Sequence, residues 1–335
     1  MSNISVMGAG TWGMALAILL ANNGNDVTVW SAVPAEIRML KETHKHQNLL
    51  EAVIPDSMKF TEDIETALAD PDIVVMGVAS IYTRATAKRM SPFVRNGQII
   101  VNVAKGIEEN TLAVLTEQIS EEIPQAKVAV LSGPSHAEEV SRGIPTSVTI
   151  GVDDRETAEY LQKIFRSRVF RPYISSDVLG IELGGALKNV IALAAGMADG
   201  LGYGDNTKAA LITRGMAEIA RLGLAMGARE ETLYGLSGIG DLIVTCASMH
   251  SRNRRAGILM GQGKSMEEAM KEVNQVVEGV YSAKAALALS RKYNVDMPIV
   301  EQMNKVLFEG ESPAASVDGL MLREAKPENP RVDWE

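Results

Sequence analysis

The order of hydrophobic and polar positions divides the chain into two parts with different periods. In the first part, short apolar or β-branched runs alternate with helical patterns; these runs are ISVMG, DVTVW, DIVVMGV, QIIVNVA, KVAVLSG, TSVTIG and RVFRPYI. Runs without polar alternation, separated by helices, indicate strands of a mostly parallel sheet that is buried on both faces. The pattern therefore predicts a doubly wound α/β domain over residues 1–176.

From about Asp177 the pattern becomes helical almost to the end of the chain. Apolar positions recur at helical spacing in runs such as NTKAALITRGMAEIARLGLAMG and YSAKAALALSRKY, and glycine-rich turns separate them. The predicted fold class is α/β, with a Rossmann-type doubly wound sheet followed by an all-helical C-terminal domain at residues 177–323. Residues 324–335 lack periodicity and are expected to form a flexible tail. A substrate cleft is expected between the domains, because ligands bind outside the carboxyl ends of parallel strands.

One charged residue interrupts the most apolar helical run. Between Leu183 and Ala198 every residue is apolar, small or an amide except Lys188. A buried ammonium group is costly to desolvate, so this lysine needs either a partner or a chemical role. The alternative is a lysine whose ammonium reaches water past small neighbours. This segment alone leaves both interpretations open.

Composition and charge exclude several classes of protein. The chain has 335 residues, of which 46% are hydrophobic, and its formal net charge is -9. This acidic balance disfavours nucleic acid and anionic membranes as partners, so any anion must bind in a local basic pocket. The single cysteine, Cys246, fits a reducing compartment and predicts a cytoplasmic protein. The apolar N-terminal segment lacks a positive n-region, so neither a signal peptide nor membrane insertion is expected.

Histidine placement gives no support for a metal site. His44, His46, His136 and His250 lack an accompanying set of carboxylates or cysteines, so no bound metal is expected. His44 and His46, two positions apart, are expected to be surface residues.

The N-terminal segment ISVMGAGTWGMALAILLANNGNDVTVW has the spacing GxGxxG at Gly8, Gly10 and Gly13. The first glycine permits a tight turn, the second lets a diphosphate approach the backbone, and the third lets helix and strand pack closely. A strand precedes these glycines, and a helix and a second strand follow them. The segment therefore predicts dinucleotide binding, with a glycine-rich turn of another α/β fold as the alternative.

The end of the second predicted strand leaves the choice of cofactor open. An acid there would hold the ribose 2′-hydroxyl of NAD, and a basic residue would accommodate the 2′-phosphate of NADP. The chain instead has Ser31, Ala32 and Val33, with Arg38 about one helical turn further on. Ser31 and Arg38 favour NADPH slightly over NADH.

Four further stretches, together with the glycine fingerprint, resemble the glycerol-3-phosphate dehydrogenases. They are NVAKGIE, LSGPSHAEEV, GGALKNVIALAAGMADGLGYGDNTKAA and GIGDLIVTC, the last of which is followed by SRNRR. The similarity runs in order from Val6 to about Pro298. It implies an NAD(P)-dependent enzyme that interconverts dihydroxyacetone phosphate and sn-glycerol 3-phosphate by hydride transfer and supplies glycerol 3-phosphate for phospholipid synthesis. It also implies a small phosphorylated triose as substrate and a homodimer.

The resemblance implies catalytic roles for Lys188 and Asp241. Lys188 matches the family's acid/base lysine, which would protonate the developing alkoxide, and Asp241 matches an aspartate that would orient its ammonium. Burial lowers the pKa of such a lysine and a nearby carboxylate raises it, so the sequence does not give the result. A helix N-cap is the alternative for Asp241. Lys105 matches a lysine that binds substrate and cofactor, with a solvated lysine at a strand end as the alternative.

The matching positions supply the remaining candidates. Residues that the resemblance places at the substrate are Lys105, Gly133, Ser135, Lys188, Asn189, Asp241, Thr245, Ser251, Arg252 and Asn253. Those that it places at the cofactor are Gly8, Gly10, Thr11, Trp12, Gly13, Ser31, Ala32, Lys105, Ala137, Arg252, Val276 and Glu278. Arg252 would suit a phosphate because a guanidinium offers two parallel charge-assisted bonds.

Some positions depart from the family pattern. Ala32 stands where an arginine or histidine is frequent, Ala79 stands in place of the proline of VPS, and His136 replaces the phenylalanine of GPSFA. These changes touch the rim of the cofactor site and the loops.

Two other functions are compatible with the same motifs. One is a two-domain 3-hydroxyacid dehydrogenase, in which Arg252 would bind a carboxylate. The other is a non-catalytic protein that senses NAD(P)H.

Overall fold

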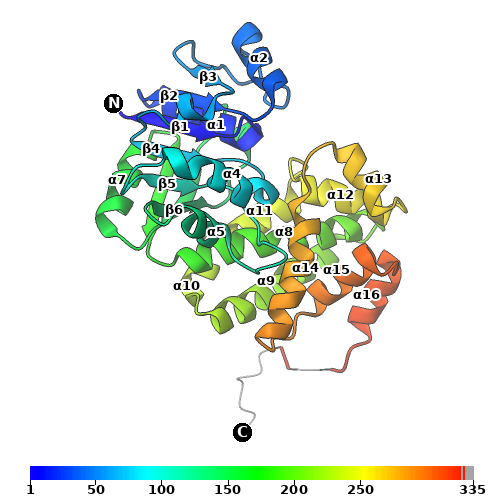
Figure 1. Cartoon of the computed structure of the whole chain (residues 1–335). Helices are drawn as coiled ribbons and strands as arrows, with labels where there is room; N and C mark the ends of the chain where they lie inside the picture. The colour runs from blue at the N-terminus through cyan, green and yellow to red at the C-terminus, as the bar shows by residue number, and fades with distance from the viewer. Residues whose placement is uncertain (326, 329–335) are drawn as a thin grey trace.

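The strands of the first domain form one eight-stranded sheet (Figure 1). They are β1 (Asn3–Met7), β2 (Asp26–Trp30), β3 (Lys59–Thr61), β4 (Ile73–Met76), β5 (Ile99–Asn102), β6 (Lys127–Ser132), β7 (Thr146–Gly151) and β8 (Phe170–Ser175). Their order in the sheet is β3-β2-β1-β4-β5-β6-β7-β8, and only the β6–β7 pair is antiparallel. The first six strands have the order of a doubly wound dinucleotide-binding sheet, which confirms the predicted fold class.

Each of the seven apolar runs identified in the sequence coincides with a strand to within a few residues, but β3 was not predicted. It has three residues, and only Phe60, between Lys59 and Thr61, is buried. A short edge strand that pairs on one side has no continuous apolar run for a sequence pattern to detect.

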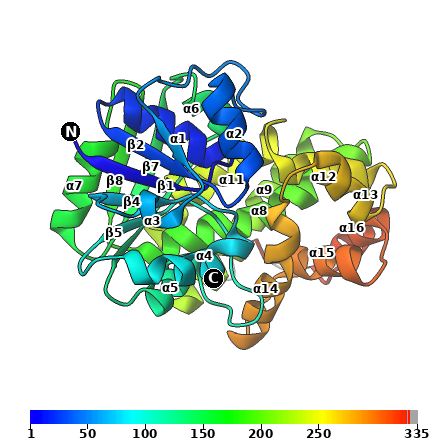
Figure 2. The same cartoon turned by 45° about the horizontal axis from the view of Figure 1, so that its top comes forward.

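Helices cover both faces of the sheet. The helices of this domain are α1 (Thr11–Asn22), α2 (Pro34–Thr43), α3 (Ile64–Ala67), α4 (Thr83–Met90), α5 (Leu115–Glu122), α6 (Ala137–Val140) and α7 (Arg155–Phe165). Figure 2 shows α1 and α6 over one face and α4 and α5 over the other. On β4, Ile73 and Val75 join the core beneath α1, whereas Val74 and Met76 join the core beneath α4 and α5. Burial on both faces explains why the strands read as unbroken apolar runs.

The second domain is helical throughout its described length, as predicted. Its helices are α8 (Val178–Gly200), α9 (Asp205–Met226), α10 (Glu230–Leu233), α11 (Asp241–Ala247), α12 (Arg252–Gly261), α13 (Met266–Val273), α14 (Glu278–Lys292), α15 (Pro298–Phe308) and α16 (Pro313–Met321), and a π turn spans Leu236–Gly240. The computed structural model describes residues 1–325, 327 and 328. Most of the expected tail, residues 326 and 329–335, lies outside the described residues.

Helix α8 is the centre of the second domain. It contacts α9, α11, α12 and α14, and every residue from Gly180 to Ala198 is buried. By length and composition alone this helix could cross a membrane, and within the described residues the bent pair Glu230–Ala247 and Arg252–Gly261 is the one other candidate. Burial inside the domain accounts for the apolar composition of α8 without a membrane.

The junction between the domains is short. β8 ends at Ser175, and Asp177 caps α8 by accepting a hydrogen bond from the Gly180 N–H at 3.0 Å. The other carboxylate oxygen of Asp177 accepts from the Arg229 N–H at 2.8 Å. The start of α8 is therefore fixed to the helical domain.

Glycines allow α8 and α12 to approach closely. A Cβ atom on Gly257 would lie 2.2 Å from the Leu193 carbonyl oxygen, and one on Gly196 would lie 2.1 Å from the Arg254 carbonyl oxygen. Contacts this short exclude any side chain at either position. Helix α12 is thereby held against the C-terminal half of α8, which follows the turn that carries Lys188.

Candidate active site

The glycine fingerprint adopts the geometry that its spacing predicts. Gly8 has a φ of +123°, and a Cβ atom on it would lie 2.8 Å from the backbone of Gly77. A Cβ atom on Gly13 would lie 2.3 Å from the Gly8 carbonyl oxygen. Gly10 precedes the first turn of α1, and nothing lies within 4 Å of the Cβ position there. Open space at the N-terminus of a helix fits the diphosphate of a dinucleotide.

His46 contradicts the expectation that it lies on the surface, because it is buried. Its Nε2 atom lies 3.1 Å from the Ala9 carbonyl oxygen, inside the glycine turn. Nearby, the Asn48 side chain donates to Thr11 Oγ1 at 3.2 Å. Burial lowers the pKa of His46, so the ring stays neutral and can hold the turn. No local pattern around His46 signals this contact, which joins positions 37 residues apart.

The carboxyl end of β2 carries an acid that the sequence did not identify. Ser31 is buried, and its hydroxyl donates to Glu36 Oε2 at 2.6 Å. Glu36 lies in the first turn of α2, whereas Ala32 and Arg38 are exposed. A carboxylate here can accept a hydrogen bond from a ribose 2′-hydroxyl and would repel a 2′-phosphate. This contact therefore opposes the slight NADPH preference inferred from Ser31 and Arg38.

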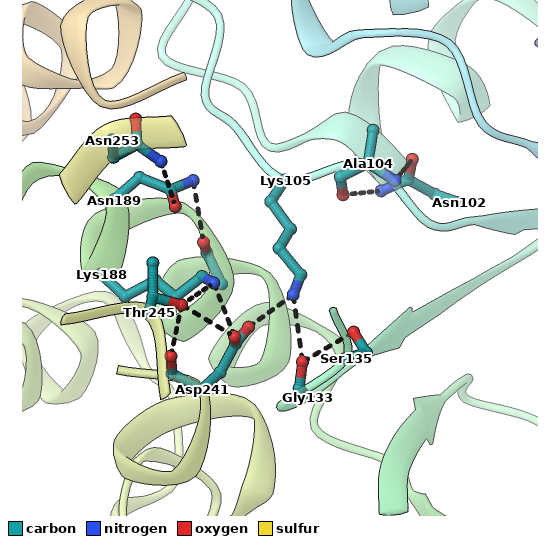
Figure 3. A network of polar contacts seen from close by, with 11 residues as sticks. Asn102, Ala104, Lys105, Gly133, Ser135, Lys188, Asn189, Asp241, Thr245 and Asn253 are labelled. Carbon is teal, nitrogen blue, oxygen red and sulfur yellow. Dashed lines mark hydrogen bonds and ion pairs between the residues drawn. The ribbon is translucent and has the colours of Figure 1, made fainter. Parts of the chain in front are cut away.

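Lys188 has the partner that its burial requires (Figure 3). Its Nζ atom donates to Asp241 Oδ1 at 2.6 Å and to Thr245 Oγ1 at 2.6 Å. The other carboxylate oxygen of Asp241 accepts from Lys105 Nζ at 2.5 Å. One carboxylate therefore binds two ammonium groups, Lys188 from α8 and Lys105 from the loop after β5. Asp241 makes no N-cap hydrogen bond, so the cap alternative is wrong.

Burial and neighbouring charges shift the pKa values of Lys188 and Asp241 in opposite directions. Burial lowers the pKa of Lys188 to about 8, and the Asp241 carboxylate limits the fall. Burial raises the pKa of Asp241, but the two lysines outweigh it, so the pKa of this carboxyl lies below its ordinary value. Near neutral pH the site therefore holds an ionised carboxylate and a lysine able to lose its proton.

The loop after β6 meets the same network. The Gly133 carbonyl oxygen accepts from Lys105 Nζ at 3.1 Å and from Ser135 Oγ at 2.9 Å. On α8, a Cβ atom at Gly185 would lie 3.4 Å from Lys105 Cγ and 2.9 Å from Ser132 Oγ. The missing side chain at Gly185 lets Lys105 lie along the helix. The structure thus brings Lys105, Gly133 and Ser135 together with Lys188, Asp241 and Thr245.

A second polar chain joins Asn189, beside Lys188, to the start of α12. Asn253 donates from Nδ2 to Asn189 Oδ1 at 3.0 Å and accepts at Oδ1 from the Gly279 N–H at 2.8 Å. Ser251 is the N-cap of α12, because its hydroxyl accepts from the Arg254 N–H at 3.1 Å. Residues of SRNRR are therefore held next to the lysine network.

Arg252 differs from its neighbour Arg254 in lacking a partner. Arg254 donates to Asp199 Oδ2 at 2.8 Å, whereas the guanidinium of Arg252 has no hydrogen bond or ion pair to any residue that the structure describes. Burial lowers the pKa of Arg252, and the charges of Glu278 and Glu138 oppose this effect. An unpaired guanidinium at the N-terminus of a helix is suited to a phosphate group.

The remaining cofactor candidates are less closely tied to the site. Glu278 accepts from the Ser80 N–H at 3.2 Å and from the Ser80 hydroxyl, which links α14 to the loop after β4. Trp12 packs against the core beneath α1, and Ala137 is buried at the start of α6. The cofactor roles of these residues and of Val276 stay predictions.

Glu182 and Asn102 support the site and were missed in the sequence. Glu182 is buried on α8 and accepts from Asn102 Nδ2 at 2.9 Å and from the Thr116 N–H at 3.0 Å. Asn102 also bonds both backbone groups of Ala104, so this pair fixes the turn before Lys105. β5 ends at Asn102, which places Lys105 in the loop beyond the strand. Burial raises the pKa of Glu182 to about 7. The sequence signal that could have identified Glu182 is the same as for Lys188, because both are ionisable residues in an apolar helix.

Fold and site together define a two-domain NAD(P)-dependent dehydrogenase with a lysine–aspartate centre. Comparison with known proteins narrows this class. The family models described as NAD-dependent glycerol-3-phosphate dehydrogenase N-terminus and C-terminus match residues 3–158 and 177–318. The chain belongs to the NAD-dependent glycerol-3-phosphate dehydrogenase family.

Individual members of this family are similar to the chain over almost its full length. The chain is 61% identical to the glycerol-3-phosphate dehydrogenase (NAD(P)+) of Agathobacter rectalis over 335 residues, covering 100% of both chains. It is 55% identical to the Fusobacterium nucleatum protein of the same name, covering 98% of this chain and 99% of that one. The crystal structure of glycerol-3-phosphate dehydrogenase from Coxiella burnetii has a TM-score of 0.91 at 35% identity and covers 96% of this chain and 99% of that chain. The predicted family and the prediction of an enzyme are confirmed.

The glycine turn predicts different effects for two alanine substitutions. Gly13→Ala places a methyl group against the Gly8 carbonyl oxygen, so it should destabilise the fold by roughly 1–3 kcal/mol and also weaken NADH binding. Gly10→Ala meets no protein atom, so it should leave the melting temperature unchanged and weaken NADH binding alone. Thermal unfolding and fluorescence titration with NADH measure the two effects. Equal losses of stability in both variants would contradict this division of roles.

Proposed function

We propose that this chain reduces dihydroxyacetone phosphate to sn-glycerol 3-phosphate, and catalyses the reverse reaction, with Lys188 as the acid/base and Arg252 as the phosphate ligand. Family membership supports the reaction. The observation that carries the assignment is the buried Lys188 ammonium, bound to Asp241 and Thr245 near the unpaired Arg252. Its product would supply glycerol 3-phosphate for phospholipid synthesis.

Proton transfer is the part of the reaction assigned to Lys188. A ketone oxygen within hydrogen-bond reach of Nζ would receive the ammonium proton as its carbon accepts a hydride. In the reverse direction the neutral amine would take the proton of the substrate hydroxyl. Asp241 orients the lysine and stabilises its charged form, while Lys105 shares the same carboxylate and offers a second donor to substrate.

NAD(P)H, when bound, supplies the hydride. Gly8, Gly10 and Gly13 provide the turn and the open helix N-terminus that fit its diphosphate. Lys105, in the loop beyond the carboxyl end of β5, would contact the nicotinamide end of the bound cofactor.

The phosphate of the substrate is assigned to the start of α12. Arg252 can offer two parallel bonds, and the hydrogen bond between the neighbouring residues Asn253 and Asn189 ties the start of α12 to the turn of α8 that carries Lys188. A 3-hydroxyacid could place its carboxylate there, but family membership favours the phosphorylated triose. The sensor alternative is disfavoured because Lys188 and Asp241 are both present and bonded.

Three further assignments stay proposals. The family resemblance implies a homodimer, the single cysteine predicts a cytoplasmic protein, and the change of pattern places the domain boundary between residues 176 and 177. The burial of α8 and of the single cysteine, Cys246, supports the location. Light scattering from the purified protein measures the oligomeric state.

The reaction is tested by following oxidation of NADH and NADPH with dihydroxyacetone phosphate and, separately, with dihydroxyacetone. Oxidation that requires the phosphorylated ketone supports the proposal. Cofactor binding without oxidation would instead favour the sensor, and oxidation with a 3-oxoacid alone would favour the hydroxyacid dehydrogenase.

The pKa of Lys188 near 8 predicts opposite pH profiles for the two directions. Ketone reduction needs the ammonium, so its kcat/KM should fall above about pH 8, whereas the kcat/KM of alcohol oxidation needs the amine and should rise toward that pH. Asp241→Asn removes the charge that stabilises the ammonium, so the fall in ketone reduction should move to lower pH. Lys188→Met should abolish turnover but retain NADH affinity. Steady-state rates across pH and an NADH titration check these outcomes, and an unmoved profile in Asp241→Asn contradicts them.

Arg252→Ala should weaken phosphate recognition. Loss of a desolvated charge-assisted contact should weaken the binding free energy of dihydroxyacetone phosphate by ~2 kcal/mol, which corresponds to a rise in KM of about 30-fold. Turnover of unphosphorylated dihydroxyacetone at high concentration should change little. Arg214→Ala, at an exposed position on α9, serves as the matched control. If KM stays constant in Arg252→Ala, the phosphate is bound elsewhere.

Opposing charges at the end of β2 govern the finer choice of cofactor. The NADPH preference drawn from Ser31 and Arg38 relies on Arg38 reaching the 2′-phosphate, and Glu36 acts against it. Glu36→Gln should therefore raise the ratio of kcat/KM for NADPH over NADH by roughly tenfold, and Arg38→Gln should lower it. Kinetics with both cofactors measure these ratios in the wild type and the two variants. A constant ratio would show that neither side chain reaches the adenosine ribose.

A further inference from the structure

His136 occupies a place where the two domains meet beside the site. It follows the Gly133–Ser135 loop, whose Gly133 carbonyl oxygen binds Lys105. Its ring lies against that of His250, with ring centroids 5.5 Å apart and planes inclined at 54°. His250 directly precedes Ser251, the N-cap of α12. The ring of His136 therefore reaches from the sheet domain to the segment assigned to the substrate phosphate.

One nitrogen of this ring has no partner. His136 Nε2 is buried and makes no hydrogen bond to any residue that the structure describes. The ring also interacts with the backbone of Val244, which favours a protonated ring nitrogen. In the neutral tautomer that carries its proton on Nδ1, Nε2 has a free lone pair. A buried polar atom without a partner is costly, which points to a ligand atom that completes it.

The surroundings of the ring keep it neutral. Burial lowers the pKa of His136 to about 4, and the positive charge of Lys188 acts in the same direction. The charge of Asp241 opposes this shift, and His250 adds to it. Near neutral pH, His136 therefore offers a hydrogen-bond acceptor in a region where the charges of Lys188 and Asp241 act on it most strongly.

Several acceptors of the site are already engaged. Both carboxylate oxygens of Asp241 bind lysines, Asn189 Oδ1 binds Asn253, and Asn253 Oδ1 binds Gly279. Of the groups without a partner, the guanidinium of Arg252 is a donor, and the Ser132 hydroxyl, beside Lys105, can donate or accept. A phosphate and a ketone oxygen are satisfied by donors, but the terminal hydroxyl of the triose has a proton that needs an acceptor.

We propose that His136 is a specificity residue whose Nε2 accepts a hydrogen bond from the terminal hydroxyl of the phosphorylated triose. The proposal rests on the proposed function and adds the recognition of the end of the substrate opposite its phosphate. A methyl group at that end leaves Nε2 unpaired, and a carboxylate brings its own lone pairs against it. His136 thereby favours a hydroxymethyl ketone over a methyl ketone or an oxoacid of the same length.

The test compares two substrates that differ in one hydroxyl group. Dihydroxyacetone phosphate and hydroxyacetone phosphate share the ketone and the phosphate, and only the former has the terminal hydroxyl. His136→Phe keeps an aromatic ring beside His250 and removes the acceptor. We expect its kcat/KM for dihydroxyacetone phosphate to fall about tenfold and that for hydroxyacetone phosphate to stay constant. His136→Gln, which restores an acceptor, should recover part of the loss.

Each other outcome has a defined meaning. An equal fall for both substrates would place His136 at the phosphate or the ketone and would overturn the proposal. Constant values for both would show that the ring only packs, and would overturn it too. Thermal unfolding and NADH titration of both variants exclude a loss of fold as the cause. Turnover of dihydroxyacetone phosphate by the wild-type protein separately tests the proposed function, so the two failures are distinguishable.

Discussion

The carboxylate of Asp241 binds one ammonium group from each domain, and the arrangement of the site depends on this contact. Lys188 lies in a helix that is buried all round, where an unpaired charge would be strongly disfavoured. Asp241 stabilises the charge enough for the lysine to keep a proton near neutral pH, and burial keeps that proton easy to lose. Because Lys105 uses the other oxygen, the same carboxylate also fixes the sheet domain relative to α8.

Helix α8 carries both residues that stabilise the fold and residues of the candidate active site. Glu182 anchors the turn before Lys105, and Gly185 leaves room for the stem of that lysine. Lys188 and Asn189 follow one turn later and meet Asp241 and the start of α12. A helix whose other positions are apolar or glycine can be packed closely on all faces and still present a charged group to the site.

The sequence predicted the features that local patterns determine, and it missed those that depend on contacts made only in the folded chain. Strands buried on both faces are apolar along their whole length, so local pattern identifies them, whereas the edge strand β3 lacks this signature. Lys188 was identifiable because its local surroundings make its charge unusual. Glu36 was missed, although it lies only five residues from Ser31, because nothing in the segment shows which way either side chain points. His46 acts on a turn that only the fold brings near it.

The junction at Asp177 keeps the covalent connection between the two domains very short. β8 stays paired with β7 up to Ser175, and the Asp177 N–H donates to Ser175 Oγ at 3.1 Å, while its carboxylate is bound within the helical domain. Only Ser176 lies between these anchored positions. Extra residues inserted here would lengthen the covalent connection, and side-chain contacts such as Lys105–Asp241 and Glu182–Asn102 would then have to hold the two domains in register by themselves.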